Sequence, residues 1–106
     1  RQMCIRDRDY LRGMGASGLG VEAAARTAAV LSTGAEGAIP LKEGYAAAMA
    51  AQNTSYACVE KNIRSMVGKL QAGACGEYQA LMGGLPAERP SNELFLRRLA
   101  RRILEW

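Results

Sequence analysis

The segment from Leu41 to Leu70 carries the pattern with the clearest chemical meaning: a short helix, a polar break at 53–55 and a longer helix. At about 100° per residue, the longer helix places apolar residues in one stripe and small, polar and cationic residues on the other side. The stripe is Val59, Ile63, Met66 and Leu70, flanked by Tyr56 and Val67, and the opposite side holds Ala57, Lys61, Arg64, Ser65 and Gly68. This division predicts a helix-turn-helix whose second helix enters the DNA major groove. The alternative is an ordinary surface helix with a solvated charged side.

Side-chain chemistry assigns roles within this pattern. Long cations reach phosphates, whereas Arg, Ser and Glu side chains can read base edges. Thr54 or Ser55 can cap the second helix by accepting a hydrogen bond from a free backbone N–H group. Glu60 and Arg64 are the best candidates for base contacts. The full set of candidate DNA-binding residues is Ser55, Tyr56, Cys58, Glu60, Lys61, Arg64, Ser65 and Lys69.

Two separated segments suggest a family. Asn53-Thr54-Ser55, followed by Val59-Glu60-Lys61 and Ile63-Arg64, resembles the recognition-helix region of the stage zero sporulation protein A family, in its C-terminal effector domain. The family has an Asn-Thr-Thr break there, then Arg-Val-Glu-Arg, one residue and Ile-Arg-His. Pro90-Ser91-Asn92-Glu93 with Phe95 is similar to the Pro-Thr-Asn-Ser-Glu-Phe entry to the family's last helix. The resemblance is good from about residue 41 to the end and weaker over residues 10–40.

The resemblance implies the effector domain of a response regulator in a two-component phosphorelay. Such a domain is a transcription factor that regulates sporulation and stationary-phase genes. The resemblance further implies duplex DNA as partner, a homodimer on tandem sites, contact with the RNA polymerase sigma subunit, and dimerisation controlled by phosphorylation of a receiver domain.

Three departures bear on specificity. Cys58 and Lys61 stand where the family has Arg, and Ser65 stands where it has His. Lys keeps a phosphate contact but lacks the bidentate fork that recognises guanine. The binding mode therefore carries over better than the operator sequence. One alternative is a helical protein-interaction module that has lost operator recognition, and another is non-specific coating of DNA.

Composition favours helices, and the pattern along the chain predicts an all-α fold, a compact one-domain bundle of about six helices that contains the helix-turn-helix. The chain has 106 residues and abundant Ala, and no segment keeps the alternation of apolar and polar residues that is typical of a strand. Its net charge of +4 is compatible with nucleic acid. No apolar run approaches the roughly 20 residues of a membrane span, and no signal peptide is present, so we expect a cytoplasmic protein without membrane contact. The expected helices cover residues 7–14, 21–31, 41–52, 56–72, 76–82 and 91–105.

The last expected helix has two interpretations. Leu96, Leu99, Ile103 and Trp106 recur at helical spacing with Phe95 beside them, and four arginines occupy much of the remaining surface. The favoured interpretation packs the apolar stripe on the core and leaves the arginines in solvent. The alternative is a dimer contact or a basic side lying along DNA phosphates.

Other motifs predict no enzyme, cofactor or metal site. Residues 13–18 match G-x-G-x-x-G, but a charged, helical segment precedes them rather than the strand that dinucleotide binding requires. The three cysteines, Cys4, Cys58 and Cys75, lack metal-ligand spacing, and the chain has no His. Residues 1–8, RQMCIRDR, resemble translated sequencing-adapter read-through, which predicts a non-native lead-in before a domain over 9–106. The alternative is a genuine polar lead-in to the first helix.

Overall fold

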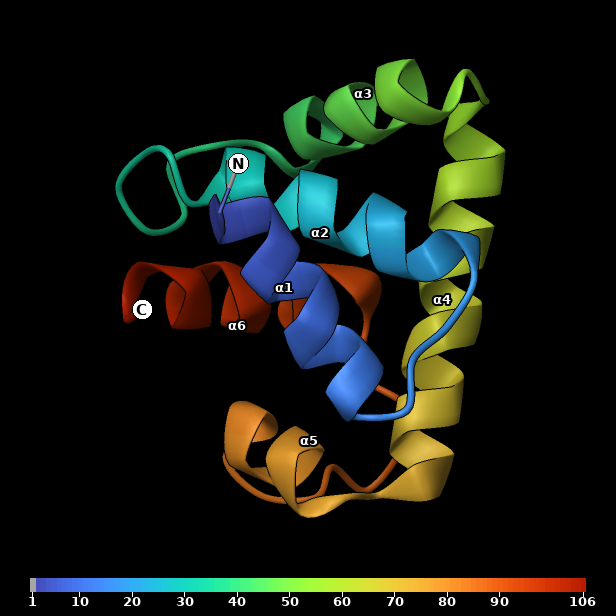
Figure 1. Cartoon of the computed structure of the whole chain (residues 1–106), viewed down its shortest axis with the longest axis vertical. Coiled ribbons are helices and arrows are strands. Elements are labelled where there is room, and N and C mark those ends of the chain that lie inside the picture. Colours follow the sequence, from blue (N-terminus) through green and yellow to red (C-terminus); the bar gives the residue numbers. More distant parts are fainter. Residues whose placement is uncertain (1) are drawn as a thin grey trace.

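A computed structural model describes the backbone of residues 2–106 and the side chains of residues 5–106. Within these residues the fold is all-helical, as predicted, with six helices and no strand. The helices are α1 (Gln2–Gly13), α2 (Leu19–Leu31), α3 (Leu41–Gln52), α4 (Tyr56–Gly73), α5 (Gly76–Met82) and α6 (Asn92–Leu104) (Figure 1). Five of the six lie within about two residues of their predicted bounds, whereas α1 begins five residues earlier than expected.

Helix α2 is the centre of the bundle. It packs against α1, α3, α4 and α6, and in Figure 1 it lies between α3 above and α6 below. Alanine dominates its sequence, so its neighbours can approach its backbone closely. Its buried residues are Gly20, Val21, Ala23, Ala24, Ala25, Thr27, Ala28 and Leu31.

Two glycines set how closely α3 and α4 approach α2. A methyl group at Gly20 in α2 would lie 2.7 Å from the Asn62 carbonyl oxygen in α4. A methyl group at Gly44 in α3 would lie 2.7 Å from the Thr27 Cγ2 atom. Both distances are far below van der Waals contact, so these positions exclude any side chain at the present helix spacing.

Larger side chains fill the remaining core. Tyr45, Tyr78 and Phe95 are its largest fully buried members, and Leu96, Leu99 and Ile103 bury the predicted stripe of α6. Trp106 follows the end of α6 and keeps 38% of its surface exposed. Its ring packs edge-on against Tyr10, with 5.3 Å between ring centroids. The predicted stripe is therefore confirmed up to residue 103, and Trp106 joins α6 to α1 instead.

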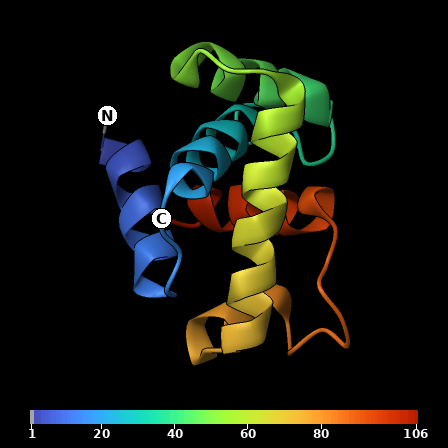
Figure 2. The same cartoon turned by 90° about the vertical axis from the view of Figure 1, so that its right-hand side faces the viewer.

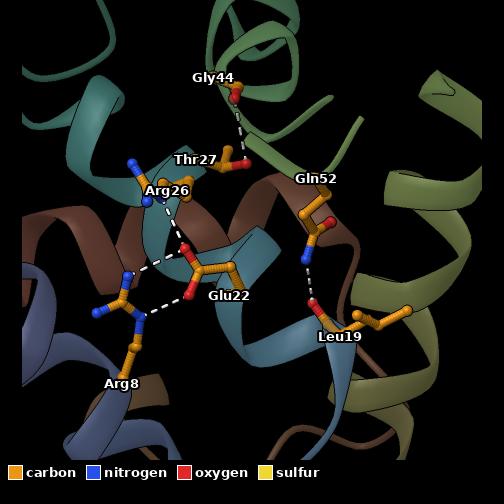
Figure 3. Close-up of polar contacts among 7 residues, drawn as sticks. All are labelled: Arg8, Leu19, Glu22, Arg26, Thr27, Gly44 and Gln52. Atoms are coloured by element: carbon orange, nitrogen blue, oxygen red, sulfur yellow. Dashed lines mark hydrogen bonds and ion pairs between the residues drawn. The ribbon is translucent and has the colours of Figure 1, made fainter. Parts of the chain in front are cut away.

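Residues 2–8 belong to a continuous helix. α1 runs through the predicted boundary between residues 8 and 9 without a break. The Arg8 guanidinium donates to both carboxylate oxygens of Glu22, at 2.6 and 3.0 Å, and Arg26 donates to the same carboxylate at 2.7 Å (Figure 3). Hydrogen bonding by Arg8, followed by that of Arg26, outweighs desolvation and lowers the pKa of Glu22 to about 2. A non-native origin for residues 1–8 stays a prediction, and Arg1 lies outside the described residues.

The glycine-rich segment 13–18 connects α1 to α2. It follows a helix and leads into another, which agrees with the prediction of an interhelical loop. Gly15 and Gly18 have φ values of 101° and 79°, in the left-handed region that glycine adopts readily. Among the described residues, no helix is long and apolar enough to cross a bilayer.

Candidate nucleic-acid interface

Helices α3 and α4 are joined by a tight turn of three residues. Asn53 adopts the left-handed conformation with φ 51° and ψ 54°, and the Thr54 N–H group donates to the Met49 carbonyl at 3.1 Å. The Ser55 hydroxyl then caps α4 by accepting the Cys58 N–H group at 3.2 Å. Of the two predicted caps, Ser55 is the one used. After the turn, α4 runs at a steep angle to α3. In Figure 1, α3 lies across the upper end of α4.

Helix α4 buries the predicted apolar stripe and exposes the predicted polar side. Val59, Ile63, Met66, Val67 and Leu70 are buried, and α4 lies on the side of the molecule that faces the viewer in Figure 2. We call this side the α4 outer face and define it as the half-buried Gly68 together with the exposed Cys58, Lys61, Arg64, Ser65 and Lys69. Of the eight predicted contacts, Ser55, Tyr56, Cys58, Lys61, Arg64, Ser65 and Lys69 are exposed, and Glu60 is half-buried.

Glu60 and Arg64 interact with each other. The Arg64 Nη1 atom lies 2.5 Å from both carboxylate oxygens of Glu60, one helical turn away. The Arg64 side chain is nevertheless 45% exposed. Exposed pairs of this kind stabilise a helix by only about 0.3–0.5 kcal/mol, so a ligand that satisfies either partner can separate them.

Asn92 fixes α4 and α3 relative to the beginning of α6. Its side-chain Nδ2 atom donates to the Glu60 carbonyl oxygen and to the Tyr45 hydroxyl, both at 3.0 Å. These two bonds connect the beginning of α6 to α4 and α3. The Tyr45 ring also packs edge-on against Tyr56, with 5.1 Å between centroids. One side of the Tyr56 ring therefore contacts α3, while Tyr56 as a whole stays 50% exposed.

Two hydrogen bonds with α2 fix the orientation of α3. The Gln52 side chain at the end of α3 donates to the Leu19 carbonyl at 3.1 Å, and the Thr27 hydroxyl donates to the Gly44 carbonyl at 3.3 Å (Figure 3). Both bonds bind α3 to α2. The helix-turn-helix pair is thus attached to one central helix.

Cys58 occupies the first turn of α4 and is exposed. Hydrogen bonding with Thr54 and then Ser55, supported by the charge of Lys61, lowers the pKa of its thiol against a smaller effect of desolvation. A lower pKa increases the thiolate fraction and with it the reactivity of the sulfur. Cys75 is also a free thiol but is half-buried, and the side chain of Cys4 lies outside the described residues.

Two segments flank the α4 outer face. On one side, the end of the α1–α2 loop, the start of α2 and α4 enclose a surface hollow of about 220 Å³, lined by Ser17 in the loop and by Asn62, Ser65 and Lys69 in α4. On the other side, the Arg89 Cδ atom lies 3.5 Å from where a methyl group on Gly68 would be. Ser17 and Arg89 had no sequence signal, because only the fold brings their segments beside α4.

The arginines of α6 do not extend the α4 outer face. The half of α6 that carries them runs away from α4, towards the opposite side of the molecule (Figure 1). Arg97 is occupied there by the Ile39 carbonyl at 2.9 Å and by the Glu93 carboxylate.

No metal-binding cluster of three or more His, Cys, Asp or Glu side chains occurs among the described residues. Searches of family models, curated proteins and solved structures found no match to this chain.

Proposed function

We propose that the chain is a sequence-specific, duplex-DNA-binding transcription regulator, the effector domain of a response regulator of the sporulation-initiation type. The observation that carries this proposal is the α4 outer face. It combines three exposed cations with small residues on one side of a helix that is braced by a capped three-residue turn. The motif resemblance over residues 41–106 points to the same function.

In this proposal the α4 outer face enters the major groove, which is about 12 Å wide and admits one helix. Arg64 leaves Glu60 to donate to guanine, and the freed Glu60 carboxylate accepts from a cytosine amino group. Lys61 and Ser65 lie beside them on the same side of α4.

Phosphate contacts surround this centre. Ser55 and Tyr56 lie at the α4 N-terminus, where backbone N–H groups and the helix dipole favour an anion. Lys69 and Ser17 line the hollow on one flank, and Arg89 adds an exposed cation on the other. Such contacts set register and affinity, whereas base contacts set sequence preference.

The regulatory context rests on the resemblance. A phosphorylated receiver domain would promote a homodimer on tandem sites, and a contact with the RNA polymerase sigma subunit would connect bound DNA to transcription. These events belong to the bacterial cytoplasm and to sporulation genes.

Fluorescence anisotropy with two labelled duplexes at several salt concentrations tests the proposal. One duplex carries tandem copies of the family's operator box and the other has the same bases scrambled. The proposal predicts tighter binding to the box, with log Kd rising by about 0.9 per phosphate contact for each tenfold increase in salt. Equal binding to both duplexes would leave only non-specific electrostatic contact, and absence of binding to both would contradict the proposal.

A helical protein-interaction module is the second candidate. The Glu60–Arg64 pair favours it, because both predicted base-reading side chains already satisfy each other. The departures at Cys58 and Ser65 also favour it. In this case Arg64→Ala changes no DNA-dependent property.

A further inference from the structure

A second cationic site lies between α5 and α6. A surface hollow of about 250 Å³ is lined by Arg98, Arg101, Arg102 and Glu105 of α6 and by Ala80 and Leu81 of α5. The three arginines are spaced i, i+3 and i+4, so they share one side of α6. Three arginines and one glutamate therefore line the hollow, and the Arg101 guanidinium also lies near Glu36, which lines a neighbouring hollow.

The positive charge of this hollow is only partly balanced. Arg102 pairs with Glu105 at 3.4 Å, and Arg101 pairs with Glu36 at 4.0 Å. Both carboxylates are more than 60% exposed, so water screens these pairs strongly. Arg98 forms no ion pair with any residue whose side chain is described.

Neighbouring groups position two of the three guanidinium groups. The Arg98 Nη1 atom lies 3.4 Å from where a methyl group on Gly83 would be, so its guanidinium lies against the end of α5. Gly83 has a φ of 76° and no side chain, which leaves that space free. The Arg102 guanidinium lies 5.8 Å from the centroid of the Tyr10 ring. Such contacts reduce the side-chain entropy that ligand binding would otherwise cost.

We propose that this hollow binds a small anion that carries at least two phosphate groups. Guanidinium groups recognise phosphate oxygens through paired hydrogen bonds. Residues one turn apart on α6 are separated by about 5.4 Å along its axis, a span that two linked phosphate groups can bridge. A duplex on the α4 outer face would not reach the hollow, because α6 carries these arginines to the opposite side of the molecule (Figure 1). The site is therefore independent of DNA binding.

Isothermal titration calorimetry of the full chain with inorganic pyrophosphate tests this site, with sulfate at equal ionic strength as the reference anion. We expect saturable binding of one pyrophosphate per chain that sulfate does not match. Arg98→Gln should weaken binding about tenfold, the loss of one charge-assisted hydrogen bond. Arg101→Gln should weaken binding in the same direction, and because Arg101 is exposed, this variant keeps the fold if Arg98→Gln does not.

Arg12→Gln is the matched control, because Arg12 is an exposed arginine on α1 and lies outside the hollow. It should change the pyrophosphate affinity less than twofold, as should Arg64→Ala on the α4 outer face. Equal losses of pyrophosphate affinity in Arg12→Gln and Arg98→Gln would mean that binding depends only on the net charge of the chain. Loss of pyrophosphate binding in Arg64→Ala would mean that the anion binds at α4. Either result, or a wild-type chain that does not bind pyrophosphate, overturns the proposal.

Discussion

The Asn92 side-chain amide donates a 3.0 Å hydrogen bond to the main-chain carbonyl of Glu60, and thereby attaches the start of α6 to the middle of α4. The same nitrogen donates to the Tyr45 hydroxyl of α3 at 3.0 Å. One buried side chain therefore connects both helices of the helix-turn-helix to a third helix. Asn92 also belongs to the segment that resembles the family's entry to its last helix.

Asn92→Ala should destabilise the fold. The variant loses two buried hydrogen bonds and leaves the Tyr45 hydroxyl without a partner, at a cost of about 1–3 kcal/mol in the free energy of unfolding. Urea denaturation followed by circular dichroism measures the loss. The neighbouring Glu93→Ala removes an exposed side chain and should cost less than about 0.5 kcal/mol. Equal effects of the two substitutions would contradict a special role for Asn92.

Gly20→Ala should lower stability although alanine favours helices. The added methyl group would lie 2.7 Å from the Asn62 carbonyl and 2.9 Å from the Met66 Cβ atom, so α2 and α4 must separate. Overpacking of this kind costs about 1–3 kcal/mol. Gly73→Ala in α4 meets nothing within 4 Å and should stabilise the protein by about 0.4–1 kcal/mol. Thermal unfolding of the two variants should therefore shift in opposite directions, and a shared increase in Tm would show that the helices are not so closely packed.

Asp7→Asn should stabilise the protein increasingly as the pH rises above about 4, with the full effect at neutral and higher pH. Asp7 is fully buried, and neither carboxylate oxygen has a hydrogen-bond partner among the described residues. Burial outweighs the charges of Arg8 and Arg6 and raises the pKa of Asp7 from 3.8 to about 6. A pKa raised on folding means that the ionised carboxylate opposes folding. This penalty is absent below pH 3.8 and develops fully as the pH rises through 6.

The stabilisation by Asp7→Asn should therefore be larger at pH 8 than at pH 4, by on the order of 2 kcal/mol. Urea denaturation at both pH values measures it. Asp9→Asn changes an exposed neighbour on the same helix and serves as the control. An Asp7→Asn effect that is the same at both pH values would mean that the carboxylate is not desolvated.

Alkylation of Cys58 should report on DNA binding. Because Cys58 is exposed and has a lowered thiol pKa, iodoacetamide should modify it faster than the half-buried Cys75 at pH 8. A saturating duplex should slow only the reaction at Cys58, because the α4 outer face would then be covered. Mass spectrometry of a Cys4→Ser variant separates the two remaining thiols. Unchanged Cys58 reactivity with bound DNA would place the duplex elsewhere.

The period of α4 made its two sides predictable. Val59, Ile63, Met66 and Leu70 recur at helical spacing, and all four are at most 3% exposed in the structure. The same spacing put Lys61 and Arg64 on the exposed side, where they lie. Such patterns are local, so a sequence window contains all the information they require.

The flanks of the site depend on long-range packing, which no local pattern encodes. Arg89 reaches Gly68 only because the connector between α5 and α6 returns along α4. Asn92 could be matched to a motif, but its bonds to Glu60 and Tyr45 join residues 32 and 47 positions away. The early start of α1 was missed because residues 1–8 were expected to be a non-native lead-in outside the domain, whereas α1 begins at Gln2.

The sequence preference of an Arg64→Ala variant shows whether the α4 outer face reads DNA. Arg26→Ala is the matched control, because Arg26 has the same 45% side-chain exposure and the same i, i+4 pair with a glutamate, but lies on α2. Anisotropy gives the ratio of Kd values for scrambled and operator duplexes. We expect Arg64→Ala to reduce this ratio by about 1–3 kcal/mol, or roughly 5- to 150-fold, and Arg26→Ala to preserve it. An unchanged ratio in Arg64→Ala, or the same fall in both variants, would contradict the claim.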